Sequence, residues 1–335
     1  LMVAATASGT TMIRNAASEP HVRQLGEMLI AMGAEISGLD SNTLIVKGNK
    51  LHGAEVTVEG DHIEAASYIA LAACTKSPVT ITGILRPHDY WMTRRVFERI
   101  GVRFRIHPNR IEVPGGQRMK IQPDFGNAIP QISDGPWPQF PSDMMSCMIV
   151  CATQAKGSVL FFEKMFESRI YFVDRLIAMG ANAVVCDPHR VVISGPAKLH
   201  AVEMSSPDIR AGMAMVLAGV CAKGRSIVHN ADTIFRGYAN ICEYYDGLRR
   251  RSAVRRQSGC ASEKFLGIPD QCRQHLRSFA VPNVRMDSET HQSAGCGSAD
   301  SLSEPALRHV RFVSAGTFQG NLSVEKTLSD LVADR

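Results

Sequence analysis

The sequence predicts an α/β (α+β) protein made of repeated βαβαββ units. Four segments follow one plan, in which an apolar helix, a break and a short strand precede an amphipathic helix, a glycine and a pair of strands. The breaks fall 69, 79 and 67 residues apart, at Gly9, Pro78, Gly157 and Gly224. Spacing this regular indicates internal repetition, and the apolar first helix of each unit predicts that neighbouring units enclose it.

The first unit opens partway through the plan, with "LMVAATASGTTMIRNA", "HVRQLGEMLIAMGAEISG" and "NTLIVKG". Its amphipathic helix carries apolar side chains at spacings of three and four, which form one face: Val22, Leu25, Met28, Leu29 and Met32. A glycine suited to a left-handed helix end follows this helix and its two counterparts, at Gly33, Gly101 and Gly180.

The three later units supply inner helices, which we expect over residues 62–75, 143–155 and 208–222. Tyr68–Cys74 and Met213–Val220 are apolar nearly all round, so these helices should be buried and related by a pseudo-threefold arrangement. The strands "VTITGI" and "AVVCD" combine β-branched residues with alternation. The fourth unit runs through "PDIRAGMAMVLAGVCAKGRSIVHN" and "RGYANICEYYDGL", where the plan stops.

The bulk composition is that of a globular protein. The 335 residues are 45% hydrophobic and 21% charged, and no apolar run reaches the ~18 residues that a membrane helix needs. The net charge of +5 comes mostly from residues 249–335, which hold 13 Lys/Arg against 9 Asp/Glu. We therefore expect neither a nucleic-acid nor a membrane partner.

The nine cysteines show no CxxC pair and no spacing typical of a disulfide framework. A reduced, cytoplasmic setting is the expectation. Cys147 and Cys151 lie four apart on one predicted helix face, which leaves two alternatives. They are buried fillers, which we favour, or metal ligands, which lack a nearby third ligand in sequence.

Several motifs within these repeated units resemble those of a known protein family. They are "NAASEP", "LIAMGAEISG", "HIEAASYIALAA", "FPSDMMS", "MFESRIYFVDRLIAMGA", "DIRAG", "VLAGVCAKG" and "FRGYANI". Together they resemble the enolpyruvyl transferases, and among them those that act on UDP-N-acetylglucosamine, over residues 1–248. The resemblance implies an inside-out barrel of two domains with three units each. Residues 1–58 would be the last unit of a truncated first domain and residues 59–248 the second domain. Residues 249–335 match nothing and have the composition of a disordered or frame-shifted tail.

The resemblance implies transfer of the enolpyruvyl group of phosphoenolpyruvate to the 3-hydroxyl of UDP-N-acetylglucosamine, with no cofactor and no metal. It also implies a cytoplasmic monomer that serves peptidoglycan synthesis, and through it cell-wall biogenesis, cell shape and cell division. Two alternatives stay open, a non-catalytic remnant that binds the nucleotide-sugar and the shikimate-pathway enolpyruvyl transferase. The second shares the fold but not "FPSDM" or "FESR".

Asp143 is the one acid at the mouth of a long apolar run. From the residues alone it is a helix cap or first-turn acid, which stabilises a helix by ~0.5–2 kcal/mol, or a carboxylate kept for chemistry. The resemblance implies the catalytic aspartate that meets the sugar's 3-hydroxyl and takes its proton.

The resemblance also implies a set of substrate-binding residues: Met165, Arg169, Asp208, Arg210 and Arg236. The Met165 backbone would contact the nucleotide-sugar, with a core strand residue as the alternative. Arg236 would grip phosphoenolpyruvate, with a solvated surface arginine as the alternative. The other three are direct ligands or a structural ion-pair set. Glu19 and Glu64 are expected as scaffold acids near the domain junction.

Two positions depart from the family pattern, Trp137 in "GPWPQFP" and Phe235 before "RGY". The family's Lys-Asn pair and its mobile loop with the proton-donating acid would precede Leu1. None of the nine cysteines lies in that loop context. We therefore expect no turnover from these 335 residues by themselves.

Overall fold

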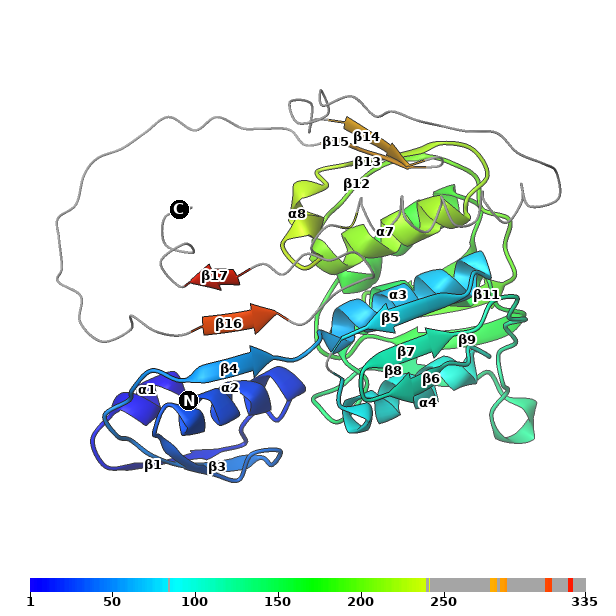
Figure 1. Ribbon diagram of the computed structural model, residues 1–335. Coiled ribbons are helices and arrows are strands. Elements are labelled where there is room, and N and C mark those ends of the chain that lie inside the picture. The colour runs from blue at the N-terminus through cyan, green and yellow to red at the C-terminus, as the bar shows by residue number, and fades with distance from the viewer. Residues whose placement is uncertain are drawn as a thin grey trace, which may run out of the picture.

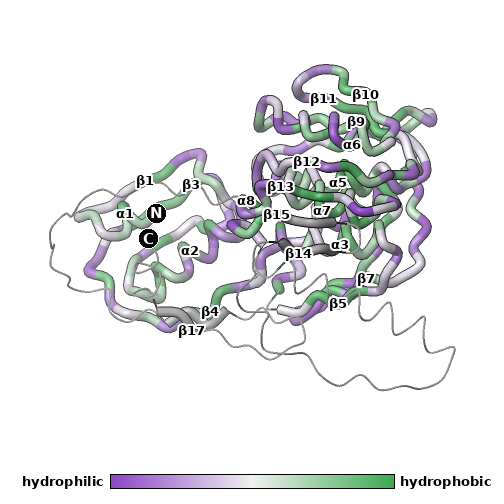
Figure 2. Tube along the Cα trace, turned by 90° about the horizontal axis from the view of Figure 1, so that it is seen from above, coloured by the Kyte–Doolittle hydropathy of each residue, from purple (hydrophilic) through white to green (hydrophobic). Residues whose placement is uncertain are grey.

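Three buried helices form the centre of the larger of two bodies (Figure 1). The computed structural model describes residues 1–83, 85–238 and 241, and the backbone of four strands beyond them. The central helices are α3 (His62–Thr75), α5 (Ser142–Thr153) and α7 (Ile209–Cys221). Each packs on the other two, and they run side by side as mainly apolar tubes (Figure 2). The expected helices are confirmed to within two residues at each end.

The composition of these helices explains their burial. Twelve of 14 residues are buried in α3, 11 of 12 in α5 and 9 of 13 in α7. Full burial of one large apolar side chain contributes about 1.5–3 kcal/mol, so helices apolar all round are stable only when enclosed. In α5 the one residue that is not buried is Asp143.

Sheets and outer helices cover the central helices. One antiparallel sheet has the order β5 (Val79–Thr82), β7 (Arg110–Val113), β6 (Arg105–His107). A second has the order β10 (Asn182–Asp187), β11 (Arg190–Gly195), β9 (Gly157–Phe162), β8 (Gln131–Ser133). The third contains β12 (Glu203–Ser205) and β13 (Ser226–His229). The outer helices are α4 (Trp91–Arg99), α6 (Val173–Ala178) and α8 (Asp232–Phe235), with 3₁₀ turns η1 (Pro87–Tyr90), η2 (Phe125–Asn127) and η3 (Arg169–Phe172).

The expected glycine helix ends are confirmed by backbone geometry. Gly33, Gly101 and Gly180 have φ of 104°, 84° and 97°, in the left-handed region where a Cβ is strained. They follow α2 (Pro20–Ala31), α4 and α6 and turn the chain into the next strand. A left-handed glycine therefore ends the amphipathic helix in each of the first three units.

Residues 1–58 form the smaller body, which has its own core. It consists of α1 (Met2–Thr6), β1 (Thr10–Arg14), α2, β2 (Glu35–Ser37), β3 (Thr43–Lys47) and β4 (Glu55–Val58). Its buried apolar residues include Leu29, Leu44 and Val46, in a cluster separate from that of the larger body.

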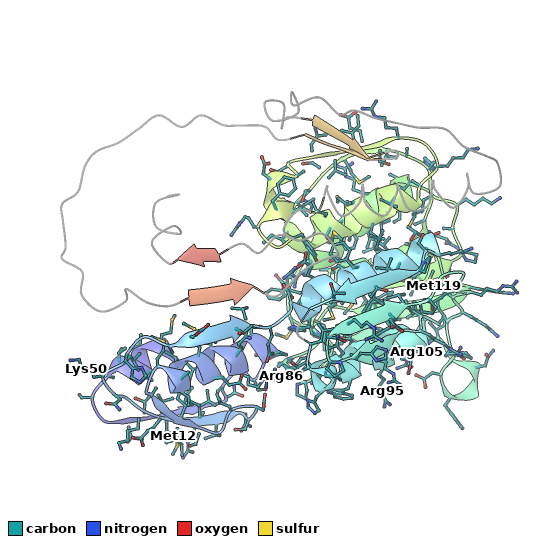
Figure 3. The ribbon with its side chains drawn as sticks, viewed as in Figure 1. Met12, Lys50, Arg86, Arg95, Arg105 and Met119 are labelled. Atoms are coloured by element: carbon teal, nitrogen blue, oxygen red, sulfur yellow. The ribbon has the colours of Figure 1, made fainter. Side chains whose placement is uncertain are left out.

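Ion pairs join the two bodies. Arg23 on α2 donates to both carboxylate oxygens of Asp89 in η1, at 2.9 and 2.7 Å. Arg86 reaches back across the junction to Glu27, with nitrogen–oxygen distances of 3.0 and 2.8 Å, and also pairs with Glu59 (Figure 3). Apolar periodicity does not predict these ion pairs, since their partners lie far apart in the chain.

Four strands of the segment 249–335 belong to the described backbone. They are β14 (Ser278–Val281), β15 (Val284–Asp287), β16 (Arg311–Ser314) and β17 (Glu325–Thr327). β15 extends the β12–β13 sheet, and β16 pairs with β4 in parallel. β16 lies in the short piece "HVRFVSAGTF", which has the β-branched and aromatic residues typical of a strand. The prediction of a disordered or frame-shifted tail concerns residues that otherwise lie outside the described part.

Among the described residues, none of the helices has the length and apolar character to cross a membrane.

Candidate active site

Asp143 is held by two arginines from different elements. Its Oδ1 accepts a hydrogen bond from Arg169 Nη2 at 2.7 Å, and its Oδ2 lies 3.2 Å from Arg210 Nε. Arg169 begins η3 and Arg210 lies in the first turn of α7. The Asp143 side chain keeps 40% of its surface exposed, against 16% for each arginine. A solvent-accessible carboxylate is therefore fixed by two largely buried cations.

The geometry excludes Asp143 as the helix cap and places it as an acid in the first turn of α5. Pro141 occupies the N-cap position of α5, and no backbone amide of that helix donates to the Asp143 side chain. Asp61, in contrast, caps α3 by accepting from two amides, Ile63 N at 2.8 Å and Glu64 N at 3.2 Å. The capping interpretation of Asp143 is wrong, although its first-turn position still favours a negative charge.

The protonation state of Asp143 follows from its surroundings. Burial by itself would raise the pKa of this carboxyl, but the charge of Arg210 and the hydrogen bond from Arg169 outweigh it and lower the pKa below its ordinary value. The group is therefore a carboxylate at neutral pH and accepts hydrogen bonds through both oxygens.

Acidic groups at the starts of two inner helices, α3 and α5, interact with Arg210 at the start of the third, α7. Burial and the neighbouring Asp61 raise the pKa of Glu64, in the first turn of α3, to about 7, and Arg210 opposes the rise. Arg210 also interacts with Asp143 of α5. The starts of α3, α5 and α7 therefore lie near one another, and their free amides add positive potential to the same region.

Arg210 is oriented by an aromatic ring. Its guanidinium carbon lies 5.3 Å from the ring centroid of Tyr238, whose hydroxyl is 2.9 Å from Ser67 Oγ on α3. Arg210 Nη1 is buried and forms no hydrogen bond within the described part of the chain. The Tyr238 ring therefore fixes the direction of the Arg210 guanidinium at the start of α7.

Arg169 connects Asp143 to residues that the sequence did not single out. Its Nη1 donates to Ser142 Oγ at 2.5 Å, and Ser142 Oγ lies 2.8 and 2.9 Å from the two carboxyl oxygens of Glu163. Glu163 is fully buried. An acid that directly follows the apolar strand "GSVLFF" is the sequence signal that could have drawn attention to it.

Met165 lies in the loop between β9 and η3. The residue is 45% exposed and lies outside the strands, so the alternative of a core strand residue is wrong. Its backbone amide donates to Asp134 Oδ2 at 3.3 Å. The loop leaves the strand two residues before Met165, close to the residues that hold Asp143.

Asp208 and Arg236 have other environments. Asp208 caps α7, since its Oδ1 accepts from Arg210 N at 2.7 Å and from Ala211 N at 2.9 Å. The ion pairs of both site arginines run to Asp143 rather than to Asp208. Arg236 follows α8, which packs at the start of α7, and it is exposed without an ion pair among the described residues. The structure thus brings Asp143, Arg169 and Arg210 into contact but not Arg236.

The two departures from the family pattern differ in their surroundings. The Trp137 ring packs edge-on against His62 at the start of α3, with centroids 5.8 Å apart. Burial lowers the pKa of His62, so this imidazole is neutral at neutral pH. Phe235 is 44% exposed at the end of α8. Trp137 therefore contributes to the packing at a helix start, whereas Phe235 presents an apolar surface beside Arg236.

The expectation for the cysteine pair on α5 is confirmed: Cys147 and Cys151 are buried in the apolar core. No group of three or more His, Cys, Asp or Glu in the described residues could hold a metal ion.

Comparison with known proteins identifies the family. The family model for EPSP synthase (3-phosphoshikimate 1-carboxyvinyltransferase) matches residues 1–244. Proteins named UDP-N-acetylglucosamine 1-carboxyvinyltransferase are similar to the chain. That of Bradyrhizobium diazoefficiens is 51% identical over 74% of this chain and 58% of its own length, and that of Treponema denticola 50% identical over 72% and 57%. The chain thus spans just over half the length of these relatives.

Solved structures support the fold. The enolpyruvyl transferase NikO from Streptomyces tendae aligns with a TM-score of 0.64 at 23% identity, over 74% of this chain and 57% of that one. EPSP synthase from Acinetobacter baumannii aligns with a TM-score of 0.56 at 19% identity, over 74% and 58%. The prediction of an enolpyruvyl-transferase fold from the repeat and its motifs is confirmed. This chain belongs to the EPSP synthase family of enolpyruvyl (carboxyvinyl) transferases.

Proposed function

We propose that this chain supplies part of an enzyme that transfers the enolpyruvyl group of phosphoenolpyruvate to the 3-hydroxyl of UDP-N-acetylglucosamine. The observation that carries the proposal is the partly exposed Asp143 carboxylate, fixed by Arg169 and Arg210 where three helix starts meet. The names of the relatives at 45–51% identity support UDP-N-acetylglucosamine as the acceptor. The solved EPSP synthase structure is only 19% identical, so the shikimate-pathway alternative has weaker support.

The reaction joins the sugar oxygen O3 to C2 of phosphoenolpyruvate while C3 gains a proton. The C2–O bond to phosphate then breaks, C3 loses a proton, and the vinyl ether and phosphate are released. In our proposal Asp143 accepts the hydrogen bond of the 3-hydroxyl and takes its proton as the O3–C2 bond forms. Its lowered pKa keeps it ionised beforehand, and the hydroxyl becomes acidic enough to transfer its proton only as that bond develops.

The cations of the site suit the anionic substrates. Arg210 lies in the first turn of α7 and pairs with Asp143, and Arg236 is exposed beside the start of the same helix. In the proposal these arginines and Arg169 bind the carboxylate and phosphates, since guanidinium stays charged and binds such groups bidentately. Asp208 acts through its cap, which fixes the first turn that carries Arg210.

Met165 would contribute through its backbone. Its amide is occupied by Asp134, whereas its carbonyl accepts no hydrogen bond from the other described residues. We propose that this carbonyl meets the nucleotide-sugar, and side-chain identity matters little for such a contact.

The wider setting is part of the proposal. Residues 1–58 would be the last unit of a first domain and residues 59–248 the second domain of a monomeric, cytoplasmic enzyme of peptidoglycan synthesis, with the consequences for cell-wall biogenesis, cell shape and cell division that this implies. The main alternative is a non-catalytic protein that binds the nucleotide-sugar. Sequencing of the gene upstream of the codon for Leu1 separates the two, because the enzyme needs the segment with the proton-donating loop.

Ligand selectivity tests the choice of acceptor. The 335-residue chain is expected to bind UDP-N-acetylglucosamine saturably in a calorimetric titration and to show no saturable binding of shikimate 3-phosphate. Arg210→Met should lower the affinity for the nucleotide-sugar by about tenfold or more, since a hydrogen bond to a charged group contributes ~1.5–3 kcal/mol. Arg190→Met, which removes a half-exposed arginine on β11, is the matched control and should leave binding unchanged. Preferential binding of shikimate 3-phosphate would overturn the assignment.

A further inference from the structure

Two fully buried carboxyl groups lie behind the Asp143 site, and the proposed reaction uses neither. Asp134 and Glu163 have no exposed surface. Asp134 follows β8 and Glu163 follows β9, and the parallel register pairs Ser133 with Phe162. The next residue of each strand therefore meets the other, which brings the two acids together.

The pair binds the backbone of the loop that carries Met165. Asp134 accepts from Lys164 N at 2.6 Å and from Met165 N at 3.3 Å. Glu163 accepts from Phe166 N at 3.3 Å. Three successive amides are thus fixed by two side chains, so the position of the Met165 carbonyl depends on this pair.

The pair also supports Asp143 through a chain of hydrogen bonds. Arg169 Nη1 donates to the Ser142 oxygen, so the one hydroxyl hydrogen of Ser142 is left for Glu163. The second terminal nitrogen of Arg169 donates to Asp143. A displacement of the Glu163 carboxyl would therefore move Ser142 and Arg169, and with them Asp143.

Two adjacent carboxyl groups without access to water cannot both be ionised. The charged and titratable groups around them are few: Arg169 in the loop, Asp143 at the start of α5, and His189 between β10 and β11, whose ring Nδ1 lies 2.8 Å from the Glu163 carbonyl oxygen. Lys164 and Arg190 lie instead over the Phe162 ring. No cation among the described residues contacts the pair directly, so one retained proton is the stable arrangement.

We propose that Asp134 and Glu163 are positioning residues that share one proton, and that this proton keeps the Met165 loop and the Ser142–Arg169–Asp143 chain in their binding geometry. The inference rests on the proposed function, because it deepens the account of the nucleotide-sugar site. Loss of the proton places two charges in contact, which favours a loop conformation that separates them and weakens the site.

The direction of the pH effect follows from Glu163. Burial, reinforced by Asp134, raises its pKa from the ordinary 4.5 to about 8. The folded state therefore holds the proton more tightly than the unfolded chain. The resulting stabilisation is complete below about pH 4.5 and is lost as the pH rises through about 8. Binding that needs the protonated pair declines above about pH 8, by a factor that approaches tenfold for each pH unit.

The test is the pH dependence of UDP-N-acetylglucosamine binding to the 335-residue chain between pH 6.5 and 9. Glu163→Gln keeps an acceptor for Ser142 and Phe166 N and donates from its amide to Asp134, so it imitates the protonated acid. This variant is expected to bind within about twofold of the wild type at pH 7 and to lose the alkaline decline. Glu167→Gln, an exposed acid in the same loop, is the control and should keep the wild-type profile. Any titration of the ligand itself affects all three proteins equally.

A second measurement separates this proposal from the proposed function. Amide NMR signals of Lys164, Met165 and Phe166 in the ligand-free wild type should shift together with an apparent pKa near 8, and those shifts should be absent in Glu163→Gln. Absence of nucleotide-sugar binding at every pH, with these shifts present, would overturn the proposed function but leave the proton-sharing pair. Identical pH profiles of the wild type and Glu163→Gln, or the absence of the shifts, would overturn the pair.

Discussion

Replacement of Asp143 by alanine is expected to reduce turnover by about 10²–10⁴-fold, the usual effect of losing a general base. The assay is phosphate release from UDP-N-acetylglucosamine and phosphoenolpyruvate by this chain supplied with the part of the Bradyrhizobium relative that it does not cover. The variant loses the carboxylate that pairs with both Arg169 and Arg210, so the 3-hydroxyl would lose the acceptor that we propose for its proton. Binding of phosphoenolpyruvate should change much less than turnover.

Asp174→Ala provides the matched control. Asp174 is also an acid in a first helical turn, that of α6, but it is exposed and has no ion pair among the described residues. Both variants remove a favourable interaction with a helix start, which contributes about 0.3–1 kcal/mol. Only the Asp143 variant should lose turnover. Equal turnover of the two variants, with intact folding, would show that Asp143 stabilises its helix and does nothing else.

Replacement of Arg23 by methionine is expected to cost about 3–5 kcal/mol of unfolding free energy, because it leaves a buried charge unpaired. Both side chains of the Arg23–Asp89 pair are only 6% exposed, and the contact joins α2 of the smaller body to η1 of the larger one. The Asp89 side chain would be left at the junction with no other cation at hydrogen-bond distance among the described residues. Urea denaturation followed by circular dichroism measures the loss.

Lys47→Met is the control for this prediction. The Lys47–Glu35 pair lies at the surface of the smaller body, with side chains 59% and 63% exposed. Exposed pairs contribute only about 0–1 kcal/mol, so this variant should unfold almost like the wild type. A similar small effect for Arg23→Met would mean that water reaches Asp89 and that the junction is not a rigid contact.

The sequence was sufficient to predict the repeated fold. Apolar periodicity and recurrent glycines are local signals, and they located all three inner helices and the left-handed ends at Gly33, Gly101 and Gly180. The burial of Cys147 and Cys151 followed from the same pattern. These features depend on residues close together in the chain, which is why they could be inferred without coordinates.

The contacts of the site could not be predicted in the same way. Asp143 and Arg210 are 67 positions apart in the sequence; the apolar run drew attention to Asp143, but only the resemblance to a family drew attention to Arg210. Asp134 and Glu163 meet because of the register between β8 and β9, and Arg23 is buried because Asp89 arrives from another body. Periodicity alone would have assigned Arg23 to an exposed helix face. Long-range pairing and domain contact carry no local signature.

The central claim is that the Asp143 carboxylate receives the 3-hydroxyl of the nucleotide-sugar, and a thermodynamic cycle tests it most directly. The measurement is the affinity of wild-type and Asp143→Ala chains for UDP-N-acetylglucosamine and for its 3-deoxy analogue. We predict that the wild type prefers the natural sugar by about tenfold and that the variant binds both equally, since a hydrogen bond to a charged group contributes ~1.5–3 kcal/mol. The same preference in both proteins would contradict the account, because the hydroxyl would then be recognised without Asp143.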